Sequence, residues 1–340
     1  MAETAATPVL TSSSPQERVM EIVLGVLHGR CLIAAAELGV ADTLASGPQP
    51  VEELAAKVGA NADNLFRLLR ALETIDVFKQ VSPGVFANTP VSDCLRKGAT
   101  GSQWAFVNLL APGFGIWDGY TEMLETLRTG RTALFDRWGH DLWEYYRRNP
   151  VRAEIFNESM RSMTAPMTPA VTAAYDWSRF PVIADIAGGI GTQLIDILDA
   201  NPGCRGVVFD QPEVVATAIP HERVERVAGN FFENIPVEAD AYILRNIIHD
   251  WSDEDALSIL RTLRRATKPT ARVTLIEWLI PDTPDFNFGK WTDITMMVAV
   301  GGRERTRADF ERIFRQSGFE LEEIVATAST FTIIVGRPSM

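Results

Sequence analysis

The sequence predicts an α/β protein whose C-terminal half forms a doubly wound, mostly parallel sheet, preceded by a mainly helical domain. Three patterns predict this fold class. From residue 182 onward, short apolar strands alternate with helical segments, as a sheet with crossover helices requires. The first of these strands runs into a glycine-rich turn and then a helix over 192–200. Before residue 98, helices precede a hairpin in the order of a winged helix.

The composition is that of an ordinary globular protein and argues against some classes of partner. The chain has 340 residues, enough for two domains with sizeable cores, and 46% of them are hydrophobic. The formal net charge of -12 argues against nucleic acid or an anionic membrane as the main partner, because both select basic surfaces. No apolar run reaches the roughly 18 residues that span a bilayer.

The N-terminus and the cysteines indicate a cytoplasmic protein. Residues 1–15 are rich in Ala, Thr and Ser and lack the basic and apolar regions of a signal peptide, so we expect a disordered leader. Cys31, Cys94 and Cys204 are too few and too widely spaced for a disulfide framework or a zinc site. A reducing cytoplasm is therefore the simplest location.

Residues 16–98 are expected to form a winged-helix-like domain. Its expected elements are helices over 19–38, 51–58 (with Gly59 as a C-cap) and 61–75, followed by hairpin strands over 77–81 and 85–88. The third helix would be the recognition helix of a DNA-binding domain, but Arg67 and Arg70 are its only cations. We therefore expect this domain to pack against a second subunit rather than against DNA.

Residues 99–180 are expected to be helical and to form a substrate-pocket and linker region. The segment is rich in large aromatic side chains, most of which belong to a core and some of which are expected to wall a pocket for a flat substrate. The second domain is expected over 181–340. Its strands are predicted over 182–186, 205–209, 224–228, 241–244, 272–276, 321–325 and 331–335, the last two as an antiparallel hairpin.

The turn after the first of these strands indicates which nucleotide the sheet binds. Gly189 and Gly191 begin a dinucleotide motif, but Leu194 occupies the position of its third glycine. Asp185 lies where a carboxylate would repel a phosphate and attract a positively charged ligand, and Asp210 ends the next strand, where an acid can bind a ribose diol. A sulfonium, an ammonium and a ribose describe S-adenosylmethionine (SAM). The alternative is an ordinary turn between a strand and a helix.

A histidine follows the fourth predicted strand, at the edge of the sheet where α/β proteins place their chemistry. His249 is expected in a tight loop before a helix that Ser252 caps and that carries Asp255 in its first turn. Methyl transfer from a sulfonium is an in-line displacement that needs an unprotonated nucleophile. Because a phenol titrates at about 10 and a histidine at about 6.5, His249 is suited to take a phenol's proton.

Two carboxylates are candidates to orient this base. Glu277 ends a strand at the same edge of the sheet. Burying a carboxylate is costly unless it has a partner, so an acid at the end of a buried strand indicates a functional role. Glu304 precedes a helix that starts near Arg307, and its alternative role is to pair with Arg303 or Arg305. Either glutamate could hold the imidazole and stabilise its protonated form.

Together these residues resemble the plant-type and bacterial small-molecule O-methyltransferases, a SAM-dependent family that includes caffeate, hydroxyindole and polyketide-tailoring enzymes. The resemblance extends from about residue 16 to residue 337. The motifs that carry it are Asp185-Ile-Ala-Gly-Gly-Ile-Gly191, Val208-Phe-Asp-Gln-Pro212, Gly229-Asn-Phe-Phe232, His249-Asp-Trp-Ser-Asp-Glu-Asp255, Asp293-Ile-Thr-Met296 and Glu304-Arg-Thr306. The resemblance implies an N-terminal winged-helix dimerisation domain, a C-terminal Rossmann-like SAM domain and a homodimer.

The resemblance also implies roles for individual residues. His249 would be the general base, flanked by Glu277 and Glu304. The positions that would bind SAM are Asp185, Ala187, Gly188 and Gly189 in the turn, Asp210 at the ribose, Asn230 and Phe231 at the adenine, and Arg245 near the SAM tail. The positions that match the family's acceptor pocket are Phe156, Met160, Met163 and Met296.

Three of these positions depart from the family pattern. Ala187 replaces the first glycine of the turn, and a methyl group is tolerated there only at negative φ. Asn230 replaces an aspartate, so one adenine contact loses its charge and can keep its hydrogen bond. Arg245 stands where many relatives have lysine, which changes geometry more than charge.

The sequence therefore predicts a SAM-dependent O-methyltransferase of secondary metabolism that methylates a phenolic hydroxyl of an aromatic small molecule. The same fold can methylate nitrogen or carbon or tailor a substrate in another SAM-dependent way, but a base is most needed for a hydroxyl. Alternatives from other classes are a winged-helix transcription regulator with a ligand-sensing domain, which the acidic charge opposes, and a dehydrogenase, which the missing glycine opposes. No metal is expected, because His28, His140, His221 and His249 are scattered.

Overall fold

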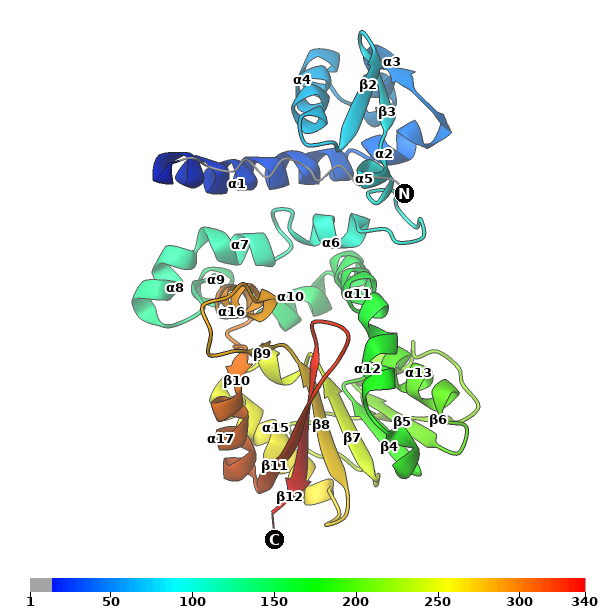
Figure 1. The fold of residues 1–340 in the computed structure, drawn as a ribbon, viewed down its shortest axis with the longest axis vertical. Coiled ribbons are helices and arrows are strands. Elements are labelled where there is room, and N and C mark those ends of the chain that lie inside the picture. The colour runs from blue at the N-terminus through cyan, green and yellow to red at the C-terminus, as the bar shows by residue number, and fades with distance from the viewer. Residues whose placement is uncertain (1–13, 340) are drawn as a thin grey trace. The chain divides into compact units, whose positions relative to one another are not determined.

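The computed structural model describes residues 14–339, which form two compact units (Figure 1). The first unit comprises the chain up to Trp117 together with Tyr146–Met163, and the second comprises Asp118–Tyr145 and the chain from Thr164 onward. The predicted leader falls on residues that lie outside this description, apart from Ser14 and Pro15. Each unit has its own hydrophobic core.

The first unit begins with helices followed by a hairpin, in the predicted order. Ser14 forms a capping box with Glu17 before α1, and Gly59 ends α3 in the left-handed conformation (φ 69°), as expected. The sheet has the order β1-β3-β2. These elements are α1 (Pro15–Glu37), α2 (Val40–Thr43), β1 (Gln49–Pro50), α3 (Val51–Val58), α4 (Ala62–Glu73), β2 (Phe78–Ser82), β3 (Val85–Asn88), α5 (Pro90–Asp93) and α6 (Trp104–Leu109).

Helix α1 presents many apolar side chains to solvent. Those that are large and exposed are Val19, Met20, Ile22, Val23, Val26 and Leu27. Little of this helix is buried, and by length and composition alone it could cross a membrane. The sequence-based expectation missed it because Glu21, His28 and Arg30 interrupt the apolar run. An exposed apolar face of this kind marks an interaction surface.

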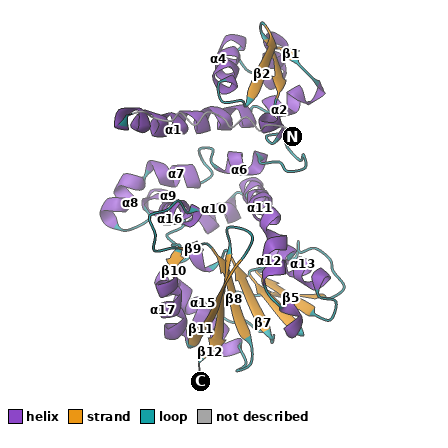
Figure 2. Cartoon of the chain, viewed as in Figure 1, coloured by secondary structure: helices purple, strands orange, loops and turns teal. Residues whose placement is uncertain are grey.

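The second unit is built on a seven-stranded sheet in the order β11-β12-β8-β7-β4-β5-β6 (Figure 2). Strands β6, β5, β4, β7 and β8 are parallel, and β12 and β11 add an antiparallel hairpin at one edge. The strands are β4 (Val182–Ile186), β5 (Arg205–Asp210), β6 (Val224–Ala228), β7 (Ala241–Arg245), β8 (Arg272–Glu277), β11 (Phe319–Ala326) and β12 (Thr332–Pro338). The predicted mostly parallel sheet and its terminal hairpin are confirmed. Because the chain winds outward in both directions from β4, the crevice at β4 and β7 is where this architecture binds ligands.

Helices α15 and α17 cover one face of this sheet. Leu260 and Leu263 of α15 and Phe310 and Phe314 of α17 share one buried cluster with strand residues such as Leu275. The remaining helices of this unit are α8 (Met123–Thr129), α9 (Ala133–Trp138), α12 (Thr168–Ala174), α13 (Thr192–Ala200), α14 (Pro212–Val215), α15 (Asp253–Ala266), α16 (Phe288–Ala299) and α17 (Arg307–Ser317). The chain passes between the units within α7 (Ile116–Thr121), α10 (Leu142–Arg148) and α11 (Pro150–Thr164).

A second, two-stranded sheet lies just beyond the carboxyl end of β8. Strand β9 (Leu279–Ile280) pairs in parallel with β10 (Arg305–Thr306). Because Glu277 ends β8 and Glu304 precedes β10, this pairing brings the two predicted carboxylates to the same edge of the main sheet. No sequence pattern predicted so short a pairing.

Candidate active site

The glycine-rich turn after β4 is hydrogen-bonded to the neighbouring strand β5. The backbone N–H groups of Ala187 and Gly188 both donate to the carbonyl of Phe209, at 2.7 and 3.4 Å. The turn is left-handed at Ala187 (φ 54°), Gly189 (φ 58°) and Gly191 (φ 84°). The expectation that Ala187 would need a negative φ is therefore wrong. The bonds to Phe209 hold it in a conformation that costs an L-residue roughly 1–2 kcal/mol.

Gly188 is required for a different reason, because it lies against the buried side chain of Asp185. A Cβ on Gly188 would come within 2.6 Å of Asp185 Cγ and 2.7 Å of its Oδ2. Burial raises the pKa of Asp185 to about 7, although the positive charge of Arg245 opposes this shift. A ligand that brings positive charge to the turn would favour the ionised carboxylate, which fits the ammonium of SAM's amino-acid end.

Asp210 ends β5 and binds the same turn. Its Oδ2 accepts a hydrogen bond from Gly189 N at 2.8 Å, and its Oδ1 accepts one from Gln211 N at 2.7 Å. Burial raises the pKa of Asp210, and these two hydrogen bonds oppose the shift. Each carboxylate oxygen has a second lone pair, so Asp210 can hold the turn and still accept hydrogen bonds from ribose hydroxyls.

Arg245 ends β7, two strands away from Asp210 across the sheet. Its guanidinium donates to Thr168 Oγ1 (2.9 Å), Gln193 Oε1 (2.8 Å) and Thr164 O (2.9 Å). Its buried Nε has no hydrogen-bond partner among the described residues. Burial lowers the pKa of Arg245 to about 10, but the group stays cationic at neutral pH. A buried acid and a buried cation with an orphaned donor together fit the ammonium and the carboxylate at the amino-acid end of SAM.

Asn230 and Phe231 follow β6. Asn230 is exposed and folds back on its own turn: its Oδ1 accepts from Phe232 N and its amide donates to Glu233, each at 3.0 Å. The ring of Phe231 makes edge-to-face contacts with Phe232 and Trp251, at centroid distances of 5.0 and 5.9 Å. An aromatic group of this kind suits a purine. The assignment of Asn230 and Phe231 to adenine stays a prediction.

His249 lies in a single 3₁₀ turn, Ile248–Asp250, between β7 and α15, as predicted. Its Nδ1 forms a 2.8 Å hydrogen bond with Glu304 Oε1 and lies 3.7 Å from Glu277 Oε2. Its Nε2 lies 3.4 Å from Asp250 Oδ1. His249, Glu277 and Glu304 are 7%, 0% and 3% exposed, so the fold brings the three predicted catalytic residues into one buried cluster.

The two glutamates act on different parts of the histidine turn. Glu277 Oε1 accepts hydrogen bonds from the backbone N–H groups of Ile247 (3.2 Å) and Ile248 (2.9 Å), so it holds the turn itself. Glu304 binds the imidazole ring rather than the arginines considered as its alternative partners. One buried oxygen of each glutamate has no hydrogen-bond partner in the part of the chain that the structure describes.

These carboxylates make His249 a stronger base than an ordinary histidine. Burial alone would lower the pKa of His249, but the charges of Glu304, Glu277 and Asp250 outweigh burial and raise it. Burial raises the pKa of Glu277 in turn, against the opposing charge of His249. His249 therefore keeps its proton to a higher pH than the ordinary value of about 6.5.

The same cluster has the spacing of a metal site. One donor atom from each of His249, Glu277 and Glu304 lies within 4.8 Å of the others. The sequence did not show this spacing, because the three residues come from separate segments. In this cluster His249 Nδ1 is already engaged by Glu304, and burial raises the pKa of Glu277.

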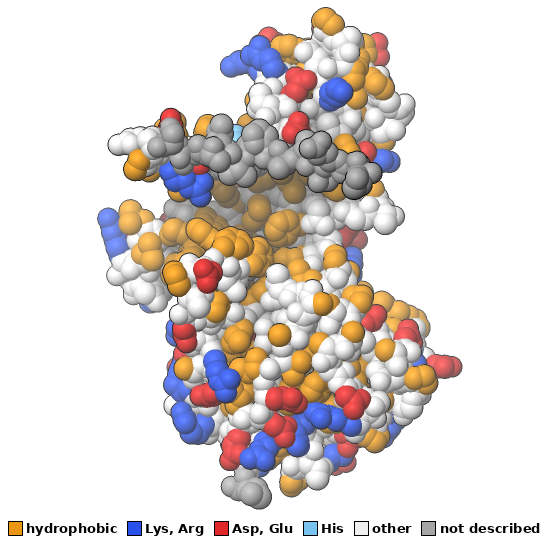
Figure 3. All heavy atoms as spheres, viewed as in Figure 1, with side chains coloured by type: hydrophobic (Ala, Val, Ile, Leu, Met, Phe, Trp, Pro, Cys, Tyr) orange, Lys and Arg blue, Asp and Glu red, His pale blue; other side chains and the backbone are white. Residues whose placement is uncertain are grey.

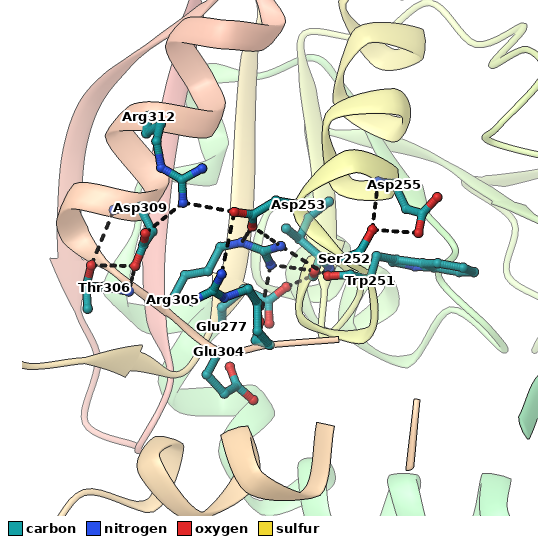
Figure 4. Close-up of polar contacts among 12 residues, drawn as sticks. Trp251, Ser252, Asp253, Asp255, Glu277, Glu304, Arg305, Thr306, Asp309 and Arg312 are labelled. Carbon is teal, nitrogen blue, oxygen red and sulfur yellow. Dashed lines mark hydrogen bonds and ion pairs between the residues drawn. The ribbon is translucent and has the colours of Figure 1, made fainter. Parts of the chain in front are cut away.

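Sequence reasoning missed several residues that shape the histidine turn. Asn246 has a left-handed backbone (φ 52°) just before it, and its buried Oδ1 has no partner among residues 14–339. Gly302 packs so closely that a Cβ would lie 2.1 Å from His249 O. Arg305 is fully buried and pairs with Asp253 (Figure 4). Gly301 and Gly302, an adjacent pair of glycines before Glu304, were the one sequence signal that could have indicated the close approach of this segment to the histidine turn.

The predicted acceptor positions are divided between the two units. Phe156 and Met160 lie on α11 and pack against the core of the first unit, where the rings of Phe156 and Tyr146 are 4.7 Å apart. Met163 lies on the same helix, whereas Met296 lies on α16 of the second unit. The role of these four residues in acceptor binding stays a prediction.

Comparison with known families distinguishes among the enzyme classes considered. Residues 120–320 match the model of the O-methyltransferase domain, and residues 20–98 match that of the O-methyltransferase dimerisation domain. The chain belongs to the O-methyltransferase family. The resemblance seen in the motifs is thus confirmed, the cofactor of this O-methyltransferase is SAM, and its dimerisation domain supports a homodimer.

Relatives of this O-methyltransferase match it over nearly the whole chain. Phenazine O-methyltransferase PhzM of Lysobacter antibioticus is 36% identical over 327 residues, which are 94% of this chain and 95% of PhzM. The 8-amino-8-demethylriboflavin N,N-dimethyltransferase of Streptomyces davaonensis is 33% identical over 90% of each chain. The structure of NcsB1, an O-methyltransferase from neocarzinostatin biosynthesis, in complex with SAM and 2-hydroxy-5-methyl naphthoic acid, has a TM-score of 0.81 at 28% identity, covering 91% of this chain and 95% of NcsB1.

Replacing Ala187 with glycine should stabilise the second unit. Glycine adopts the left-handed conformation without the steric cost, so we expect a gain of about 0.5–1 kcal/mol after its larger entropy in the unfolded chain is subtracted. Thermal unfolding of Ala187→Gly measures this. The control is Ala184→Gly in the buried strand β4, which should lower the unfolding midpoint. An equal loss of stability in both variants would contradict the argument.

Replacing Gly302 with alanine should damage catalysis. The new Cβ would meet backbone atoms of His249 and Asp250 at 2.1–2.4 Å, so the histidine turn must move. A displacement of about 1 Å can cost roughly 10²-fold in rate, and we expect a loss of that order in methyl transfer with little change in S-adenosylhomocysteine affinity. Gly203→Ala, where nothing lies within 4 Å, is the matched control and should be neutral. Wild-type turnover in Gly302→Ala would show that the turn is not fixed by this contact.

Proposed function

We propose that this O-methyltransferase transfers the methyl group of SAM to a phenolic hydroxyl of an aromatic small molecule in secondary metabolism, with His249 as general base. The observation that carries the proposal is the buried 2.8 Å hydrogen bond between His249 Nδ1 and Glu304. It fixes the tautomer and orientation of the ring, so that Nε2, which lies 3.4 Å from Asp250 Oδ1, is the nitrogen that would meet a substrate proton. A hydroxyl needs such a base, whereas a nucleophile that is already unprotonated does not.

In the proposed mechanism the cofactor supplies an electrophilic methyl group, and the chain positions the two reactants and supplies a base. Asp185, Asp210 and Arg245 hold the cofactor through its charges and its ribose. His249 takes the acceptor's proton, and the adjacent carboxylates stabilise the imidazolium that forms. General base catalysis typically contributes about 10²- to 10⁴-fold, and positioning of the two reactants can contribute more.

The raised pKa of His249 matches the base to a phenolic acceptor. Transfer from a phenol at about 10 to an ordinary imidazole at about 6.5 is uphill by several pKa units. The carboxylates around His249 reduce this difference. The consequence is that the neutral imidazole, which is the form that can accept the proton, becomes populated only at higher pH.

The relatives support an aromatic acceptor. PhzM is named for a phenazine, and NcsB1 was solved with a naphthoic acid. The predicted acceptor positions carry an aromatic ring and three thioethers, and such flexible, polarisable side chains suit a flat guest. A second candidate function is methylation of an aromatic amine, because one relative is named as an N,N-dimethyltransferase.

We also propose how the rest of the chain serves this function. Residues 16–98 would dimerise, with the exposed apolar face of α1 buried against the second subunit, and 99–180 and 181–340 would supply the pocket helices and the SAM domain. Acidic and basic side chains are interspersed on the visible face of the second unit (Figure 3), which offers no basic field to nucleic acid. The cysteine usage supports a cytoplasmic location.

Cofactor binding and catalysis should separate by mutation. In Asp210→Ala, loss of charged hydrogen bonds worth about 1.5–3 kcal/mol should weaken S-adenosylhomocysteine binding by roughly 10- to 100-fold in calorimetry. Glu213→Ala, an exposed neighbour, is the control. His249→Ala should bind the cofactor normally and lose roughly 10²- to 10⁴-fold in methyl transfer to hydroxybenzoates, hydroxynaphthoates or hydroxyphenazines. Transfer only to arylamines in the same panel, unaffected by His249→Ala, would favour the second candidate.

The pH dependence of methyl transfer should report the raised pKa of His249. Because only neutral His249 can accept the proton, kcat/KM for a phenol should rise with pH, with a midpoint above the ordinary histidine value of about 6.5. Glu304→Gln removes the carboxylate that raises this pKa most, so the midpoint should move to lower pH while the maximal rate falls. A midpoint that stays fixed, or moves upward, would show that Glu304 does not set the basicity of His249.

A further inference from the structure

Arg305 is one of the largest fully buried side chains of the protein, yet no role follows for it from the catalytic residues alone. It lies directly after Glu304, in the two-residue strand β10. Figure 4 shows its guanidinium aimed at the segment around Trp251–Asp253, in a network that continues through Asp253 to Arg312.

The guanidinium of Arg305 is hydrogen-bonded to both ends of the histidine turn. Its Nη1 donates to Ile248 O at 2.7 Å, and its Nη2 donates to Trp251 O at 3.1 Å. These carbonyls lie immediately before and two residues after His249. Nη2 and Nε also donate to Asp253 Oδ1, at 2.9 and 3.1 Å, which neutralises the buried charge.

Two further hydrogen bonds hold the residues next to Arg305 in place. Arg303 N donates to His249 O at 2.8 Å, and Glu304 N donates to Asp293 Oδ1 at 2.8 Å. The backbone of Glu304 is thus held by Asp293 and the backbone of His249 by Arg303, and Arg305 joins the two segments.

We propose that Arg305 is a positioning residue for the reaction: it holds the turn of His249 against the segment of Glu304, so that the Nδ1–carboxylate hydrogen bond keeps its length and direction. This inference rests on the proposed role of His249 as base. Arg305 acts through backbone carbonyls and Asp253, and touches neither reactant.

Only an arginine meets the geometry of this place. The two carbonyls of the histidine turn, the carbonyl of Arg303 (3.2 Å from Nη1) and the carboxylate of Asp253 approach the guanidinium from different directions, and its planar fork presents five donors to them. A lysine ammonium on a flexible stem can keep the charge opposite Asp253 but cannot hold both carbonyls at these distances. Arg305→Lys therefore removes the positioning while it retains the charge.

Arg312 provides a matched control. It pairs with the other oxygen of the same acid, Asp253 Oδ2, at 3.0 Å, and with Asp309 at 2.8 Å. No hydrogen bond links it to a carbonyl of the histidine turn among the contacts of the described residues. Arg312→Met therefore weakens the same ion network without releasing His249.

The test compares Arg305→Lys and Arg312→Met in the wild-type and Glu304→Gln backgrounds. Single-turnover methyl transfer to a phenol from the hydroxybenzoate panel should fall roughly 10- to 10²-fold in Arg305→Lys and by less than about 3-fold in Arg312→Met. In the Glu304→Gln background, Arg305→Lys should add less than about 2-fold, because both changes break one interaction. Full additivity would overturn the proposal, and so would an equal loss in Arg312→Met.

A spectroscopic readout makes the test independent of the acceptor. In protein labelled with ¹⁵N-histidine, the buried Nδ1–H of His249 should give a downfield proton resonance that is lost in Glu304→Gln and in Arg305→Lys and kept in Arg312→Met. An unchanged resonance in Arg305→Lys would overturn the proposal. If instead His249→Ala methylates phenols normally, the role of His249 as base fails, while this resonance still reports whether Arg305 holds the ring.

Binding of S-adenosylhomocysteine distinguishes positioning from general stability. It should change by less than about 3-fold in Arg305→Lys, because Asp185, Asp210 and Arg245 lie on other elements. Arg305→Gln, which keeps two donors without the charge, serves as the second variant. Loss of cofactor binding in both variants would show that Arg305 supports the whole unit rather than the histidine turn, and would contradict the proposal.

Discussion

A buried imidazole held by a carboxylate is the interaction on which the chemistry proposed for this O-methyltransferase depends. The bond between His249 and Glu304 joins a strand-to-helix turn to a segment more than fifty residues further along the chain. It can persist only because the surrounding structure holds both partners in place. Glu277 ties down the start of the turn, Gly302 allows the backbones to approach, and the pairing of β9 with β10 sets their register.

The glycine-rich turn on the cofactor side of the site carries negative charge, unlike a turn that binds phosphate. A phosphate-binding turn would leave its N–H groups free for an anion, whereas here Asp185 lies beneath the turn and Asp210 occupies one of its N–H groups. Burial raises the pKa of Asp185 and so makes its negative charge costly, and the charge of Arg245 offsets this effect only in part. A positively charged ligand group would favour the ionised carboxylate further. Arg245 supplies the opposite charge at the neighbouring strand end. The family comparison and this arrangement therefore agree on SAM.

Much of the second unit could be predicted from the sequence because the parallel strands β4, β5, β7 and β8 are largely buried and read as mostly apolar runs, whereas the edge strand β6 is largely exposed. Strands 182–186 and 224–228 have the predicted bounds, and His249, Glu277 and Asp210 could be placed because each ends or follows a strand. The positive φ of Ala187 could not be predicted, because it depends on a hydrogen bond to the next strand. Arg305 and Gly302 were missed because their partners are distant in sequence, and a buried arginine looks like any surface arginine until its neighbours are known.

The measurement that tests the central claim most directly is the dependence of methyl transfer on the acidity of the acceptor. Single-turnover rates of the wild type and of His249→Ala would be compared over a series of substituted phenols with one common ring skeleton. If His249 removes the acceptor's proton, its advantage should be greatest, roughly 10²- to 10⁴-fold, for the least acidic phenols and should shrink toward unity for phenols that are already ionised. A rate ratio that is the same for every phenol would contradict the account, because His249 would then serve binding or structure rather than proton transfer.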